Sequence, residues 1–173
     1  MRQRIRKLAI AAIGTAMFAT AACAAGSGTP VKLSSSDHRF LADALSANQL
    51  EIDFSTCAAK QASSEKVRQF AQAMVAEHTR LATDMQAAND GLTPTPAPTQ
   101  QPGVNLAGRK GAEFDRAYMA LMVAYDNSAL GKFKTADGPQ HSAAIRDMVK
   151  KVLPAIGRND VAAKALQHAL ASK

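Results

Sequence analysis

The sequence contains no tryptophan, and aromatic residues make up only 5% of its 173 residues. Strands are typically enriched in aromatic and β-branched residues, whereas the alanine, leucine, lysine, glutamine and methionine that are common here favour helices. The hydrophobic fraction of 47% is still sufficient for a buried core. The composition therefore predicts one small all-α domain.

Cysteine is also scarce, with Cys23 and Cys57 alone. Cys23 falls in an N-terminal targeting pattern, so the folded part cannot build an internal disulfide framework. Cys57 lies within a helical pattern, where a small buried hydrophobic residue is its commoner role. The chain also lacks a glycine-rich phosphate loop, a nucleophile elbow and a cysteine cluster for zinc. We therefore expect a protein without catalytic activity.

Acidic residues are outnumbered, and the formal net charge is +7. Four of the 21 basic residues, Arg2, Arg4, Arg6 and Lys7, precede an apolar run at the N-terminus. Without these four, 17 basic residues stand against 14 acidic ones and are interspersed with them. This pattern is typical of a solvated surface, and we expect no nucleic-acid partner.

Residues 1–25 have the three parts of a secretory signal. A basic segment is followed by an apolar segment over residues 8–18 and by small residues over 19–25. The apolar segment is shorter than the about 20 residues that a membrane-spanning helix needs. The pattern predicts export to the periplasm or outer membrane, with a polar lead over residues 26–36.

Cys23 leaves two outcomes open at the cleavage site. Residues 20–23, Thr-Ala-Ala-Cys, resemble a lipoprotein box, in which the cysteine becomes the lipidated first residue, although Thr20 stands where leucine is usual. Cleavage after Ala21, Ala24 or Ala25 fits the small-residue rule equally well. A lipid on Cys23 is the one membrane contact that we expect.

Intact mass spectrometry of protein from its own host should show the loss of at least residues 1–21. An added mass that matches a diacylglyceryl or triacyl group would assign lipidation of Cys23. The mass of an unmodified shortened chain would assign soluble release, and a mass that retains Met1 would contradict export.

Apolar residues recur at helical spacing in four stretches. Three of them cover about residues 37–61, 64–89 and 112–136. The fourth is expected to start at Asp137-Gly138-Pro139, because proline is favourable in a first turn. Pro154 lies inside the fourth pattern and predicts a kink near residues 150–152.

Residues 91–108 form a linker whose four prolines forbid helix and favour an extended chain. Such a linker reaches about 50 Å, whereas a helix of 25 residues is about 37 Å long. It can therefore cross the full length of a bundle. Two helices, a long crossover and two more helices are the order of a ferritin-like four-helix bundle, which we expect over residues 37–173.

Six segments of the mature chain are distinctive in combination. They are Asp37-His38-Arg39-Phe40-Leu41, Asn48-Gln49-Leu50-Glu51-Ile52, Val67-Arg68-Gln69-Phe70-Ala71, Met74-Val75-Ala76-Glu77-His78-Thr79, Phe114-Asp115-Arg116-Ala117-Tyr118 and Leu153-Pro154. In this order they resemble a large family of exported bacterial proteins with a ferritin-like helical domain, commonly labelled outer-membrane proteins of unknown function. The resemblance implies the fold and export, and no established activity.

Members of that family usually carry a histidine in the third helix and another in the fourth, besides that of the second. This chain keeps His78. Alignment from Phe114 and from Leu153-Pro154 places Asp126 and Asn159 at the other two positions.

Glu51, His78 and Asp126 each fall about fourteen residues into their predicted helices, and Asn159 is near the middle of the fourth. Residues halfway along antiparallel helices meet at the same height, because every residue adds the same rise. The sequence therefore predicts a polar layer across the centre of the bundle.

The layer has two interpretations. Carboxylates and imidazole between facing helices form metal sites, and Glu51, His78 and Asp126, with Asn159 as a neighbour, suit Zn²⁺ or Fe²⁺ in a periplasmic metal-binding or redox protein. Alternatively, a hydrogen-bonded layer fixes helix register in a non-catalytic envelope protein that needs no cofactor. On sequence alone we favour the second, because no glutamate is followed three residues later by histidine, as di-iron bundles require.

Four methionines at helical spacing, Met74, Met119, Met122 and Met148, raise the alternative of copper, since thioethers select Cu(I). Methionine at this spacing is more often part of the core. We therefore expect these side chains to fill the interior.

Overall fold

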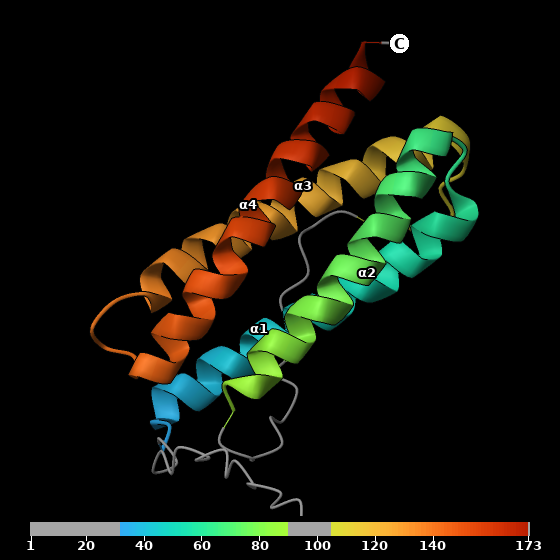
Figure 1. Ribbon diagram of the computed structural model, residues 1–173. Coiled ribbons are helices and arrows are strands. Elements are labelled where there is room, and N and C mark those ends of the chain that lie inside the picture. Colours follow the sequence, from blue (N-terminus) through green and yellow to red (C-terminus); the bar gives the residue numbers. More distant parts are fainter. Residues whose placement is uncertain (1–31, 90–104, 173) are drawn as a thin grey trace, which may run out of the picture.

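A computed structural model describes residues 32–89 and 105–172. Its helices are α1 (Ser35–Gln61), α2 (Glu65–Ala87), α3 (Gly111–Ala136) and α4 (Ala143–Ala171), and these residues include no strand. The predicted all-α four-helix bundle is therefore confirmed (Figure 1). The predicted signal segment with Cys23, most of the polar lead and positions 91–104 of the linker lie outside the described residues.

Side-chain caps determine where two of the helices start. The Ser34 hydroxyl accepts from the Asp37 backbone N–H at 3.1 Å, and the Asp37 carboxylate accepts from the Ser34 N–H at 3.1 Å. The fourth helix was predicted to start at Pro139, which is wrong. It begins at Ala143 because the Ser142 hydroxyl caps the Ile145 N–H, at 3.4 Å, and Pro139 lies in the preceding turn.

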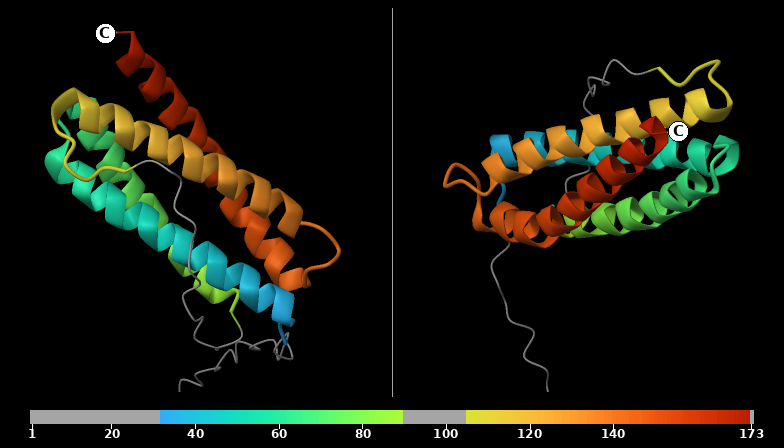
Figure 2. Two further views of the ribbon diagram at one scale, coloured as in Figure 1. Left: turned by 180° about the vertical axis from the view of Figure 1, so that it is seen from behind. Right: turned by 90° about the horizontal axis from the view of Figure 1, so that it is seen from above.

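Pro154 lies inside α4, which continues to Ala171. Proline lacks a backbone N–H and removes one helical hydrogen bond. The helix changes direction along its length in the right-hand view of Figure 2, as the predicted kink requires.

Contacts between helix ends define the topology. The Asp115 carboxylate, near the start of α3, accepts from Ser63 and Ser64 immediately before α2. His141, before α4, contacts Asp37 in the first turn of α1. α2 and α3 therefore start at the same end and run parallel, so the end of α2 and the start of α3 lie at opposite ends of the bundle (Figures 1 and 2). This arrangement agrees with the crossover that the sequence predicts.

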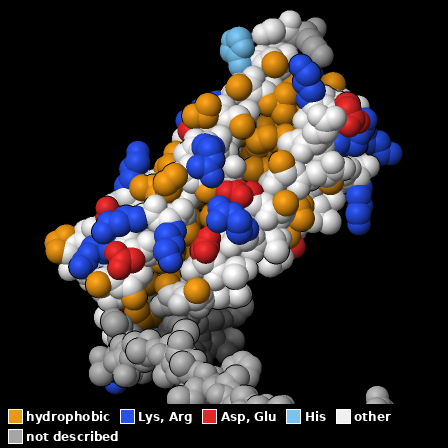
Figure 3. Space-filling view, in the orientation of Figure 1, with side chains coloured by type: hydrophobic (Ala, Val, Ile, Leu, Met, Phe, Trp, Pro, Cys, Tyr) orange, Lys and Arg blue, Asp and Glu red, His pale blue; other side chains and the backbone are white. Residues whose placement is uncertain are grey.

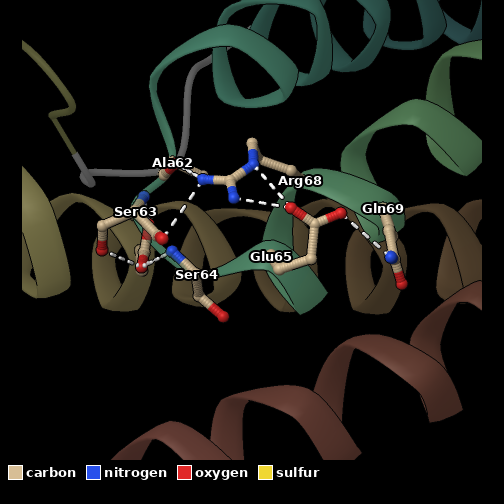
Figure 4. Close-up of polar contacts among 7 residues, drawn as sticks. Ala62, Ser63, Ser64, Glu65, Arg68 and Gln69 are labelled. Atoms are coloured by element: carbon tan, nitrogen blue, oxygen red, sulfur yellow. Dashed lines mark hydrogen bonds and ion pairs between the residues drawn. The ribbon is translucent and has the colours of Figure 1, made fainter.

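The turn between α1 and α2 is held by the buried Asp115 carboxylate. Its oxygens accept from the Ser63 N–H at 2.9 Å, the Ser63 hydroxyl at 2.6 Å and the Ser64 N–H at 2.8 Å. The Arg68 guanidinium donates to the Ala62 carbonyl and to the Glu65 carboxylate, each at 2.6 Å (Figure 4). Three hydrogen bonds to one buried carboxyl group hold the turn against the start of α3.

The interior consists of two apolar clusters with a polar layer between them. One cluster joins the first half of α1 to the second halves of α2 and α3 and the first half of α4. The other joins the second half of α1 to the first halves of α2 and α3 and contains Met74, Met119 and Met122. Met148 belongs to the first cluster. All four methionines fill the core, as predicted.

The surface carries charges of both signs. On the face shown in Figure 3, lysine and arginine side chains predominate, with fewer aspartate and glutamate side chains among them. Arg80, for example, pairs with Glu77 at 2.8 Å and with Asp84 at 3.0 Å. Within the described residues, no helix is long and apolar enough to cross a membrane.

Candidate metal centre

The polar layer between the two clusters contains Glu51 from α1, His78 from α2 and Asp126 from α3. All three are buried, with relative exposures of 3%, 3% and 1%. One potential ligand atom from each lies within 4.8 Å of the other two. The Glu51 Oε2 atom is 3.6 Å from His78 Nε2. The three residues that the sequence places at equal height are thus brought together.

Asn159, the fourth residue expected in the layer, lies beside this group. Its Nδ2 atom is 3.4 Å from His78 Nε2. Asn159 comes from α4 and is half-buried. All four helices therefore contribute a polar side chain to the layer.

The imidazole of His78 is held in one tautomer by Asn48. The Asn48 Nδ2 group donates to the His78 carbonyl at 2.9 Å, and a carbonyl can only accept. The other end of the amide, Oδ1, therefore faces His78 Nδ1, at 2.9 Å, and Nδ1 must carry the proton. This leaves the lone pair on Nε2, which lies 3.6 Å from Glu51 Oε2 and accepts a long hydrogen bond, at 3.4 Å, from the Asn159 Nδ2 group. In metal sites, the ring nitrogen that does not bind the metal usually donates a hydrogen bond, and this bond orients the histidine.

His78 is neutral at physiological pH. Burial disfavours the imidazolium and lowers the pKa of His78 from 6.5 to about 4, against the opposing effect of the Glu77 carboxylate. A neutral imidazole with an unprotonated Nε2 is the form that binds metals.

The two carboxyl groups are destabilised as anions. Burial, and then the charge of Asp126, raise the pKa of Glu51 well above its usual value. Burial and the nearby Asp160 raise the pKa of Asp126 from 3.8 to about 7, while Lys164 lowers it. The Glu51 and Asp126 carboxylates have oxygens within 4.8 Å of each other. Two negative charges this close in an apolar interior repel strongly. A bound cation would remove this repulsion.

The hydrogen bonding of these carboxyl groups differs from that of the buried Asp37 and Asp115. Both Asp126 oxygens and the Glu51 Oε2 atom have no hydrogen-bond partner in the described part of the chain. Asp115, by contrast, accepts three hydrogen bonds. Asp37 also accepts three, from Ser34, His141 and Ser142, and these outweigh the effect of burial and lower its pKa to about 2.

A chamber of about 540 Å³ leads to the three residues. It lies between α1 and α3, the two helices in front in the left-hand view of Figure 2. Glu51, His78, Tyr125 and Asp126 line its inner part. The Tyr125 hydroxyl is buried without a hydrogen-bond partner among the described residues, and burial and the Glu51 charge raise its pKa to about 12.

Sequence reasoning missed Asn48, Tyr125 and Asp160 as parts of the site. Asn48 had a detectable signal, since it lies on the inward stripe of α1 one turn before Glu51. Tyr125 directly precedes Asp126, and Asp160 directly follows Asn159. Adjacent residues on a helix point about 100° apart, so these neighbours were not expected to face the same site. Their role therefore became visible only once the helices were packed.

The fold and site define a four-helix bundle with a buried group of two carboxylates and one imidazole. The chain belongs to a family described as a domain of unknown function (DUF4142), whose model matches residues 22–166. No curated protein matches it significantly. A solved structure of CopM in the silver-bound form, obtained by co-crystallisation, is similar, with a TM-score of 0.61 and 16% identity over 75% of this chain and 93% of CopM. This likeness shows the fold alone.

Proposed function

We propose that the protein binds one divalent transition-metal ion, such as Zn²⁺ or Fe²⁺, through Glu51, His78 and Asp126. The observation that carries the proposal is the group of buried carboxylate oxygens without donors, close to the unprotonated Nε2 of His78. Two carboxylates balance the charge of one divalent cation, and a neutral imidazole completes a ligand set common for these metals. The protein would act by holding the ion, without catalysis of its own.

The alternative is the register-fixing polar layer that the sequence favours. Such a layer is stable when its members satisfy each other's hydrogen bonds, because an unpaired buried polar atom costs about 1–3 kcal/mol. Asp37 and Asp115 meet this condition, whereas Asp126 does not. The unpaired Asp126 oxygens therefore support a metal site over the register-fixing layer.

The donor atoms of this centre also differ from those of sites that bind soft metal ions. CopM was crystallised with silver, and soft ions of this kind are selected by thiolate and thioether ligands. The three donors here are carboxylate oxygens and an imidazole nitrogen. We propose that metal preference differs between the two proteins although the fold is shared.

The signal pattern of residues 1–25 supports a place of action outside the cytoplasm. We propose that the bundle works in the periplasm, free or held at a membrane by a lipid on Cys23. A divalent ion bound there would stabilise the bundle or be kept available for another component of the envelope.

Elemental analysis with calorimetry tests the proposal. Chelator-treated protein, dialysed and titrated with Zn²⁺ or, without oxygen, with Fe²⁺, should bind one ion per chain and release protons, because the ion displaces them from Glu51 and Asp126. Ag⁺ should not occupy the same site.

The matched variant combines Glu51→Gln with Asp126→Asn, which keeps size and removes both charges. It should lose the bound ion, while replacement of the exposed pair Asp53→Asn and Asp147→Asn should retain it. Equal metal content in both double variants, or none in the wild type, would show that the layer is structural.

A further inference from the structure

The candidate metal centre has room for a ligand that the protein does not supply. Three protein donors leave at least one position open on Zn²⁺ or Fe²⁺, an arrangement typical of sites that bind an exogenous group. Glu51, His78 and Asp126 all line the inner part of the chamber. The open position can therefore be reached from the chamber between α1 and α3.

We propose that this position takes the oxygen-donor head group of an amphipathic small molecule whose apolar body fills the chamber. The inference rests on the proposed metal site and names what binds there.

Tyr125 supplies a hydrogen bond for the head group. Its side chain is 4% exposed, lines the chamber and has a hydroxyl without a partner in the described part of the chain. A buried hydroxyl of this kind requires an acceptor. An oxygen atom bound to the metal would provide one, so that the head group is held by the ion and by Tyr125 together.

The middle of the chamber is apolar because the facing helices carry small side chains. Ala44 and Ala47 on α1 and Ala129 and Ala136 on α3 leave the space between the helices unfilled. The remaining apolar wall comprises Phe40, Leu81, Met85, Phe133, Val152 and Ile156. A volume of about 540 Å³ lies within the range of pockets for small organic ligands.

The mouth of the chamber is polar. Arg39 and Lys132 are exposed there, with Ser128 and Thr135 beside them. The lining residues of α1 extend from Ser36 to Glu51, which is about 22 Å of helix. An elongated molecule can therefore span the apolar part and end near the mouth.

The opposite orientation is unfavourable. If an acid placed its head near Arg39 and Lys132, its apolar tail would end against Glu51, His78 and Asp126. Buried polar groups would then face hydrocarbon without compensation. The head must be at the inner end.

Two hydroxamic acids with the same chelating head test the inference. Octanohydroxamic acid carries a long apolar tail, whereas acetohydroxamic acid carries none. Each fully buried methylene is worth about fourfold in affinity. For wild-type protein loaded with Zn²⁺, calorimetry should show at least about 100-fold tighter binding of the octanoyl probe, and little binding of either probe to chelator-treated protein.

Filling the chamber isolates the contribution of the tail. Ala129→Phe should weaken binding of octanohydroxamic acid at least about tenfold, with unchanged affinity for acetohydroxamic acid and for Zn²⁺. Ala47→Phe is a second such variant on the opposite wall, should the first fail to fold. Thr56→Phe, on the exposed face of α1 and outside the chamber, is the control and should change nothing.

The outcomes separate this inference from the metal site itself. If Zn²⁺ binds but both probes bind equally, or if Ala129→Phe and Ala47→Phe leave the octanoyl probe unaffected, the chamber ligand is refuted and the metal centre stands. Equal binding of the octanoyl probe with and without Zn²⁺ also refutes the assignment of the head group. Failure to bind Zn²⁺ overturns both proposals.

Discussion

Replacing His78 with alanine should abolish the stabilisation that Zn²⁺ gives to the wild-type protein. An ion present at about 100 times its dissociation constant stabilises the folded state by about 2.7 kcal/mol. For a domain of this size that corresponds to a rise in Tm of about 5–15 °C. The variant loses the only nitrogen donor of the centre, so its melting temperature should be the same with chelator and with Zn²⁺.

Differential scanning calorimetry of both proteins, each with chelator and with Zn²⁺ or Fe²⁺, makes the measurement. His168→Ala, at an exposed position near the end of α4, is the matched control and should keep the full metal response. Asn48→Ala should reduce metal affinity about 10–100-fold, because it removes the partner that fixes the His78 ring. If His78→Ala lowers Tm equally with chelator and with metal, the layer is structural and the proposed function is wrong.

Asp126→Asn should stabilise the metal-free protein at alkaline pH. The pKa of Asp126 is raised from 3.8 to about 7 in the folded state, chiefly by burial. The folded state therefore binds more protons than the unfolded state between these pH values, and its stability falls as pH rises from about 4 to 7. The full penalty above pH 7 is about 4 kcal/mol as an upper value. Asparagine has the same shape and carries no charge.

Urea denaturation in the presence of chelator, at pH 5, 6, 7 and 8, tests this sign. The variant should exceed the wild type by up to about 4 kcal/mol at pH 8, and the difference should shrink towards pH 5. Asp147→Asn, whose side chain is 71% exposed, should show no such difference. A variant that is less stable than the wild type at every pH would indicate that Asp126 is stabilised as an anion in the metal-free protein.

These two variants also distinguish the kinds of interaction in the layer. His78→Ala removes buried atoms together with the hydrogen bond to Asn48, so a cost of about 1–3 kcal/mol in the metal-free protein is expected as well. Asp126→Asn removes only a charge. A bound ion reverses the second effect, since the carboxylate then becomes a ligand that the folded state requires.

The sequence was informative about the height of the layer because an α-helix has a constant rise per residue. Counting from the expected start of each helix placed Glu51, His78 and Asp126 at one level without knowledge of the packing. An error of two residues in a helix start, as at Ser35, moves a side chain by only about 3 Å along the axis. The start of α4 was less predictable, because Pro139 and Ser142 are both acceptable near a first turn. In the structure Ser142 is the cap, and the neighbouring His141 contacts Asp37 of α1.

The sequence by itself therefore determined the helical class, the order of the helices around the crossover and the residues that meet at the centre, because these follow from periodicity and rise along each chain segment. Only the tertiary structure decided which polar atoms find partners. Asp115 and Asp126 are both buried aspartates of α3, yet one faces the N–H groups of Ser63 and Ser64 and the other faces Glu51. That difference depends on which helix packs opposite each residue, as does the chamber that alanines leave between α1 and α3.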